Sequence, residues 1–163
     1  MVYNHSFEIV SDNRPTFTDV TAQVEKFVNE LNIDNALVTV YSQHTTCSLL
    51  IQEQSDDVDY YGEQFLLQDM VNGMSKIFPT CTTHGAYLHP GPKHIDIAKR
   101  ERNEDAWWSY NTDAHLRSVL LGRSVCIPVE KSQLILGEFG VIYFADFDQV
   151  RARTRTVRVS VVV

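Results

Sequence analysis

The sequence NTDAHLRSVLLGRSVCIPV, residues 111–129, reads as a short helix that leads directly into a strand. Its first three residues are all types that favour a helix N-cap. Leu116, Val119 and Leu120 follow at i, i+3 and i+4 spacing, which predicts one buried helical stripe. Gly122 stands where the helix should end, because glycine accepts the positive φ of a C-terminal cap. The residues after it alternate with the period of a strand.

His115 falls in the first turn of this predicted helix. The positive end of the helix dipole disfavours a second positive charge there, so the imidazole should stay neutral and able to bind a metal or accept a proton. The free N–H groups of the same helix end suit an anion, and Arg117 and Arg123 flank it. A plain structural role, in which His115 only helps to cap the helix, remains open beside this interpretation.

The composition limits the class of protein. A length of 163 residues fits one domain, and 44% hydrophobic and 21% charged residues are ordinary for a soluble globular chain. The net charge of -7 argues against nucleic acid as a partner, since phosphate contacts need a basic face.

The cysteines and the N-terminus favour a cytoplasmic location. Three cysteines at wide spacing, with no C-x-x-C, predict reduced thiols rather than a disulfide framework. The N-terminus has no basic and apolar segments of a secretory signal. No apolar run approaches the roughly 18 residues of a membrane span, so no membrane partner is expected.

Hydrophobic periodicity predicts one α+β domain over residues 1–163, with a largely antiparallel sheet packed with helices. The expected helices begin at Thr18 or Asp19 and at Ser55, and end near Leu31 and Lys76. The expected strands cover residues 2–10, 36–41, the stretch that ends at 53, 125–130, 134–136, 141–147 and 157–163. Residues 79–110 are expected to be irregular, with Trp107 and Trp108 either anchoring this loop by burial or meeting a partner chain.

Three histidines, His44, His89 and His115, lie at predicted element ends or in loops. Their spacing is not that of a zinc finger or an H-E-x-x-H helix, so only the fold could assemble them into a metal site. Glu53 and Asp113 are the carboxylates nearest to them in sequence.

The residues that follow His44 allow two further interpretations. Thr45 and Thr46 suit phosphate oxygens, but they equally suit a half-buried strand. Cys47 near His44 raises the possibility of a Cys/His nucleophile pair. An odd offset of three residues places the two side chains on opposite faces of a regular strand, which disfavours that pair.

Two blocks of sequence resemble the YjbQ family, also known as UPF0047. HTTCSLLIQE, residues 44–53, resembles the family segment H-T-[ST]-x-[AS]-L-x-[IV]-[NQ]-E. The second block starts with HLRSVLLGRS at 115–124, continues through IPV at 127–129 and LILG at 134–137, and ends with DFD at 146–148 and an arginine-rich tail.

This resemblance implies a compact α+β homotrimer with thiamine-phosphate synthase-like activity, which joins a pyrimidine diphosphate to a thiazole phosphate. The family's motif histidines carry over as His44, His115 and His89, and its motif glutamate as Glu53. We expect His44, His115 and Glu53 to be catalytic, and His44, His89 and His115 either to hold a divalent metal, zinc or magnesium, or to act as acid and base. The expected groups for a small phosphorylated substrate are Arg117, Thr45 and Thr46.

Two segments depart from the family pattern. Gly137-Glu138-Phe139-Gly140 stands where the family usually has Gly-Thr-Trp-Gln, which would change the shape and polarity of a pocket there. Residues 94–110 are longer and more aromatic, which suits an extra lid or an altered trimer contact. Besides an enzyme, the sequence leaves open a non-enzymatic metal- or ligand-binding trimer and an interaction protein that uses Trp107 and Trp108.

Overall fold

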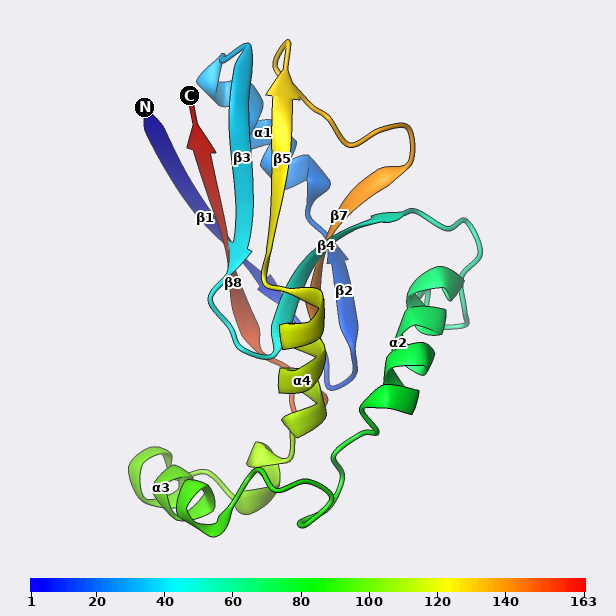
Figure 1. Ribbon diagram of the computed structural model, residues 1–163, viewed down its shortest axis with the longest axis vertical. Helices are drawn as coiled ribbons and strands as arrows, with labels where there is room; N and C mark the ends of the chain where they lie inside the picture. Colours follow the sequence, from blue (N-terminus) through cyan, green and yellow to red (C-terminus); the bar gives the residue numbers. More distant parts are fainter.

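Two antiparallel sheets form the body of the molecule, which the computed structural model describes over residues 1–163 (Figure 1). Five strands pair in the order β1-β8-β3-β5-β6, and three pair in the order β2-β7-β4. All these pairings are antiparallel, so the predicted α+β domain with a largely antiparallel sheet is confirmed. The strands are β1 (Val2–Val10), β2 (Thr16–Asp19), β3 (Asn35–Ser42), β4 (Cys47–Glu53), β5 (Ser124–Glu130), β6 (Gln133–Leu134), β7 (Gly140–Asp146) and β8 (Thr154–Val162).

Four α-helices and one 3-10 helix complete the fold: α1 (Thr21–Leu31), α2 (Phe65–Ile77), α3 (Pro92–Arg102), η1 (Ala106–Ser109) and α4 (Thr112–Leu121). The main core lies between α1 and the sheets, where Val24 and Val28 meet the alternate valines of β8. A smaller core joins α2 and α4 to β7 through Met74, Ala114 and Ala145, together with Phe147 directly after that strand. In Figure 1, α3 extends away from this body at the end that α4 begins.

The first helix begins later than the sequence predicts. Thr18 and Asp19 belong to strand β2, which pairs with β7. The Asp19 carboxylate then accepts a hydrogen bond from the amide of Thr21 at 2.9 Å, and this bond marks the true start of α1. A cap-type residue can therefore end a strand as well as begin a helix.

The second helix also begins later than the sequence predicts, since α2 begins at Phe65 and not at Ser55. A turn replaces the expected first part, because the Asp59 carboxylate accepts hydrogen bonds from the amides of Tyr61 and Glu63. Gly62 adopts φ 83°, which no helix contains. Local side-chain bonds of this kind compete with helix formation.

Residues 79–110 are more ordered than predicted, because they contain α3 and η1. Pro92 stands at the start of α3, where its missing amide proton costs no helical hydrogen bond. Asn103 in the left-handed conformation ends the helix. Prolines therefore bound a helix here rather than exclude one.

Helix α4 has the predicted bounds but the wrong buried face. Its buried residues include Ala114, Arg117 and Ser118, whereas Val119 is 80% exposed and Leu120 57%. The expected inward position of Val163 at the chain end is likewise wrong, since that residue is 56% exposed. No helix in the structure is both long and apolar enough to span a bilayer.

Candidate functional site

A polar cleft lies where three segments meet: the β3–β4 connection, the start of α4 and the β7–β8 connection. It measures about 310 Å³, and none of its lining residues is hydrophobic. The lining consists of Gln43, His44, Thr45, Thr46, Asn111, His115, Asp148, Arg153 and Arg155. Two predicted site histidines, His44 and His115, and both predicted threonines are thus brought together.

A buried ion pair forms the floor of this cleft. Arg155 donates from Nε and Nη2 to the two oxygens of Asp146, at 2.6 and 3.2 Å, and from Nη2 to the Thr46 hydroxyl at 3.0 Å. Burial alone would lower the pKa of Arg155, but the bond to Asp146 and its charge raise it overall. Arg155 is therefore held in place through Nε and Nη2, whereas its Nη1 makes no hydrogen bond within the chain.

Arg153 is the less engaged arginine of the cleft. Its Nη2 pairs with Asp148 at 3.1 Å, its side chain is 25% exposed, and its Nε–H has no hydrogen-bond partner. Burial lowers the pKa of Arg153, and the neighbouring charges of Arg151 and Arg155 lower it further. The negative charge of Asp148 raises this pKa but does not cancel the decrease. Because Arg153 lines the cleft and is partly exposed, an anion that entered the cleft would meet its positive charge.

His115 presents one nitrogen for chemistry. Its Nδ1 lies 3.2 Å from the carbonyl oxygen of Thr45, and because a carbonyl only accepts, Nδ1 carries the proton. The lone pair then resides on Nε2. Burial lowers the pKa of His115, and the bond to Thr45 opposes this only in part. The imidazole is therefore neutral near pH 7, as its place in the helix predicts.

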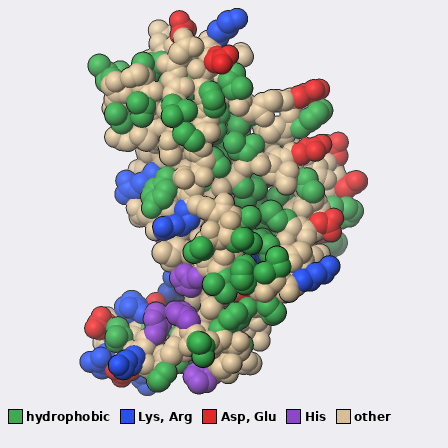
Figure 2. All heavy atoms as spheres, viewed as in Figure 1, with side chains coloured by type: hydrophobic (Ala, Val, Ile, Leu, Met, Phe, Trp, Pro, Cys, Tyr) green, Lys and Arg blue, Asp and Glu red, His purple; other side chains and the backbone are tan.

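His89 lies beside His115 with a ring-centroid distance of 5.7 Å, and His94 from α3 lies 4.7 Å from His89. The Thr112 hydroxyl donates to the carbonyl of His89 at 2.6 Å, so His89 Nδ1 must donate to that hydroxyl. Burial and the nearby His94 lower the pKa of His89. Figure 2 shows histidines gathered next to α3 on this face.

His44 is occupied by the fold. Its Nε2 accepts a hydrogen bond from the amide of Thr156 at 2.9 Å, which ties the β3–β4 connection to β8. Burial, followed by the charge of Arg155, lowers its pKa. A neutral imidazole has one lone pair, so His44 has none left for a metal.

Thr45 is exposed at the cleft, whereas Thr46 is buried and accepts from Arg155. Cys47 is fully buried, and burial raises its pKa well above the usual range. A buried neutral thiol is a poor nucleophile. This agrees with the prediction that Cys47 and His44 do not form a nucleophile pair.

Arg117 does not reach the cleft, contrary to its predicted role as a phosphate ligand. Its side chain is fully buried between α4 and α2, where Nη2 contacts Asp113 at 3.1 Å and donates to the Phe78 carbonyl at 3.0 Å. The helix face on which it lies is the one that packs inward. Arg117 thus joins two helices.

Glu53 is also remote from the histidines within one chain. It pairs with Gly140 at the end of β4 that lies opposite Cys47. Six strand steps separate the two ends, which is roughly 20 Å. The departure at residues 137–140 lies at this same far end, so it does not shape the polar cleft.

The residues do not fit the predicted metal set of His44, His89 and His115. No group of three or more His, Cys, Asp or Glu side chains is placed to hold a metal ion. Zinc prefers three or four nitrogen or sulfur ligands, and the lone pair of His44 is already used. Magnesium prefers oxygen ligands, but Asp146 and Asp148 are both paired with arginines.

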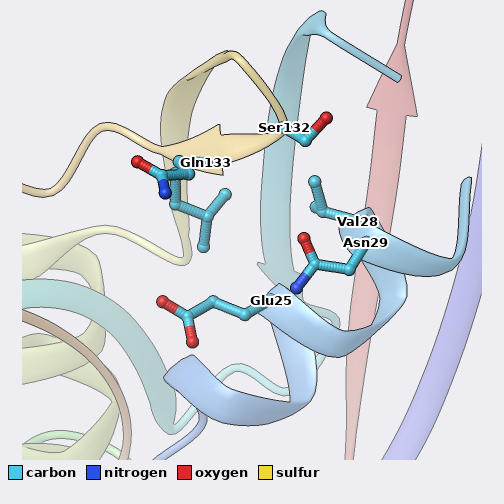
Figure 3. A pocket seen from close by; sticks show the side chains of 6 residues that line it. Glu25, Val28, Asn29, Ser132 and Gln133 are labelled. Atoms are coloured by element: carbon cyan, nitrogen blue, oxygen red, sulfur yellow. The ribbon is translucent and has the colours of Figure 1, made fainter. Parts of the chain in front are cut away.

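A second cavity of about 350 Å³ lies between α1 and the β5–β6 hairpin (Figure 3). Glu25 is the one charged residue among its lining side chains, which otherwise come from Val28, Asn29, Ser132, Gln133 and Leu134. It holds no acid–base pair and no cation. The polar cleft is therefore the better candidate site.

Trp107 and Trp108 differ in environment. The Arg151 guanidinium lies 3.8 Å from the ring centroid of Trp108 and pairs with Glu104 at 2.8 Å, so it anchors η1 to the β7–β8 connection. Trp107 is 50% exposed. Of the two predicted roles, anchoring the segment fits the partly buried Trp108, while Trp107 remains exposed to a partner.

Sequence reasoning missed the carboxylates and arginines of the β7–β8 connection as site residues. Their pattern, D-F-D followed by arginines at every second position from 151 to 155, is visible in the sequence. Such alternation carries one set of side chains to the same face of a strand. Without the position of β8 next to His44, the face that the arginines share could not be assigned.

Nearly the whole chain is similar to known proteins. The profile described as "UPF0047 protein YjbQ-like" matches residues 5–163. The chain belongs to the YjbQ-like UPF0047 family. A UPF0047 protein of Archaeoglobus fulgidus is 37% identical over 145 residues, which cover 89% of this chain and 91% of that one. UPF0047 protein YugU of Bacillus subtilis is 29% identical and covers 91% and 92%.

Solved structures of similar proteins share the fold. A YjbQ/UPF0047 protein from Clostridium acetobutylicum is 28% identical, with a TM-score of 0.69 over 98% of this chain and 99% of its own. A hypothetical protein from Aeropyrum pernix K1 is 26% identical, with a TM-score of 0.73 over 96% of each chain. The resemblance seen in the sequence blocks is confirmed at the level of family and fold.

Proposed function

We propose that the polar cleft binds the phosphate group of a small phosphorylated molecule and that His115 moves a proton there. The observation that carries this proposal is the pairing of two groups in one cleft. Arg153 has an ion pair only with Asp148 and an unpartnered Nε–H, and His115 has its lone pair on Nε2. A cation for the anion and a neutral base beside it are the two groups that such chemistry needs.

Several lining residues have a role in this proposal besides His115. Arg153 receives phosphate oxygens, and the exposed Thr45 adds a hydroxyl donor. Arg155 and Asp146 hold the floor of the cleft in place. Asn111 donates to Asp148 at 3.3 Å and keeps that carboxylate beside Arg153. The lack of apolar lining favours a small polar ligand over a lipid.

The reaction we propose is a transfer of the thiamine-phosphate synthase type, which the family resemblance implies. A carbon–nitrogen bond forms between the pyrimidine methylene and the thiazole nitrogen, while the bond from that methylene to the diphosphate oxygen breaks. Pyrophosphate leaves with the bonding electrons, while His115 Nε2 accepts a proton from the amino group of the pyrimidine ring and returns it after the new bond has formed. Arg153 stabilises the charge that develops on this leaving group. Binding without turnover is the alternative.

The direct test is formation of thiamine phosphate and pyrophosphate from the two substrates by the purified protein. His115→Gln keeps a polar side chain in the cleft but removes the proton-transfer nitrogen, and we expect a loss of about 100-fold in rate. His84→Gln, in an exposed loop position, serves as the matched control. Turnover in His115→Gln equal to that of the control contradicts the role of His115. Ligand binding without product in the unsubstituted protein favours the alternative.

We also propose self-association as a homotrimer, which the family resemblance implies. Light scattering on the eluting protein measures its mass against that of the 18.6 kDa chain. A mass of one chain at all concentrations contradicts this proposal and leaves phosphate binding unaffected.

A further inference from the structure

The outer face of α4 is apolar and uncovered. Val119 and Leu120 are 80% and 57% exposed, although the helix packs closely on its other side. Tyr41 lies near the end of α4, because it pairs across the sheet with Ser124 on one side and with Arg158 on the other. We call the surface formed by Val119, Leu120, Tyr41 and the two arginines Arg123 and Arg158 the α4 face.

The α4 face carries positive charge with no compensating acid. Neither Arg123 nor Arg158 forms an ion pair, and Arg158 contacts only the side-chain oxygen of Gln43 at 2.9 Å. An apolar centre flanked by free arginines is typical of a binding surface, in which aromatic residues and arginine are enriched.

A second surface of the chain carries negative charge and exposed aromatic rings. We call this segment, residues 53–65, the acidic loop. It contains five carboxylates and no Lys or Arg: Glu53, Asp56, Asp57, Asp59 and Glu63. Only Glu63 is ion-paired, with Arg14. Tyr60 is 95% exposed and Tyr61 72%, and the two rings contact each other edge to face. This loop presents aromatic side chains among carboxylates, with the Arg14 guanidinium 5.3 Å from the ring centroid of Tyr61 and the ring of Tyr60 left uncovered.

The acidic loop is ordered before any partner binds. The Asp59 carboxylate accepts the amides of Tyr61 and Glu63 at 2.8 and 2.9 Å, and Phe65 donates its amide to the carbonyl of Asp57. A segment held in this way loses little conformational entropy on binding. Figure 2 shows acidic side chains along the right edge of the molecule and Lys and Arg side chains near the histidines at the left.

We infer that the acidic loop of one copy of this chain docks on the α4 face of a second copy. Each surface offers what the other lacks: exposed aromatic rings meet exposed aliphatic groups, and free carboxylates meet free arginines. Two different surfaces of one chain form this contact, so it is a head-to-tail contact that each added copy can repeat. The inference rests on the self-association proposed above and specifies which surfaces meet.

The position of the α4 face links this contact to the cleft. Val119 lies one helical turn after His115 on α4, so a docked acidic loop sits at the rim of the cleft. The same loop begins at Glu53, the residue that lies far from the histidines within its own chain. Docking brings Glu53 of the neighbouring copy toward the cleft.

Charge reversal tests the pairing. The Arg123→Glu/Arg158→Glu variant places like charges opposite each other, and we expect sedimentation velocity to show association weakened about tenfold or more. Adding Asp56→Arg and Asp57→Arg to the same chain restores opposite charges and should restore the assembly. Arg100→Glu, at an exposed site on α3, is the control and should leave the assembly intact.

Three results separate the outcomes. A monomeric unsubstituted protein overturns both self-association and this inference. An assembly that survives Arg123→Glu/Arg158→Glu overturns only the assignment of surfaces. Failure of the four-substitution chain to reassemble, with a normal circular dichroism spectrum and melting curve, overturns the pairing of these two surfaces. Tyr60→Ala gives a further check, because this 95% exposed side chain should matter for assembly and not for folding.

Discussion

At the scale of single residues, the polar cleft depends on a buried charge pair. Arg155 and Asp146 are 6% and 1% exposed and meet through two hydrogen bonds. Removing one partner of such a pair leaves the other charge buried without compensation, which costs far more than losing a surface ion pair.

We therefore predict that Arg155→Ala lowers the free energy of unfolding by about 3–5 kcal/mol. Arg100→Ala, which breaks the exposed contact with Asp96, should change it by less than about 0.5 kcal/mol. Urea denaturation followed by circular dichroism measures both. Equal small effects in the two variants would show that Arg155 is not a structural cation.

The histidines predict how stability depends on pH. Burial lowers the pKa of His115 below the ordinary 6.5, and the pKa values of His44 and His89 are also lowered. A group with a lower pKa in the folded state binds more protons when unfolded. Its contribution to stability is therefore complete above pH 6.5 and is lost as the pH falls through that value toward the folded pKa.

Unfolding measured between pH 7.5 and 5 should show stability decreasing as the solution becomes acidic. His115→Gln removes one of the three groups and should reduce that slope, and His84→Gln, at an exposed loop position, is the control. Nuclear magnetic resonance titration should place the pKa of His115 below 6.5. A value above 6.5 would contradict the neutral imidazole on which the proposed chemistry rests.

At the scale of elements, the turn before α2 shows how one side chain sets a helix start. The Asp59 carboxylate accepts hydrogen bonds from the amides of Tyr61 and Glu63, which in a helix starting at Ser55 would donate to backbone carbonyls. Asp59→Ala should therefore lower the free energy of unfolding by about 1–2 kcal/mol and speed amide exchange across residues 57–65. Asp56→Ala is the control, because that residue is exposed and takes no part in these two hydrogen bonds. Unchanged exchange in Asp59→Ala would contradict the role of this carboxylate.

The sequence pattern was most informative where the period and the tertiary packing agree. Val157, Val159 and Val161 alternate in the sequence and are all buried in β8. In α4 the period was correct but the buried face was not, because Arg117 and Ser118 pack inward through hydrogen bonds while Val119 stays exposed. Hydrophobicity alone cannot identify a face that is held by polar contacts.

At the scale of the whole molecule, the candidate site combines segments that are far apart in the sequence. His44 and His115 were predicted from their positions at element ends, and the fold does bring them to one cleft. The two arginines of the cleft are Arg155 in β8 and Arg153 just before that strand. Strand β8 pairs with β3, the strand that leads to His44. Strand order across a sheet is a long-range property, so spacing along the chain could not reveal this contact.

The central claim is that this cleft recognises phosphate through Arg153. Isothermal titration calorimetry with inorganic phosphate tests it without knowledge of the substrate, with Arg153→Gln as the variant and Arg100→Gln as the control. We expect one phosphate per chain in the unsubstituted protein and the control, and affinity at least tenfold weaker in Arg153→Gln. Equal binding by Arg153→Gln and the control, or no binding by any of the three proteins, would contradict the claim.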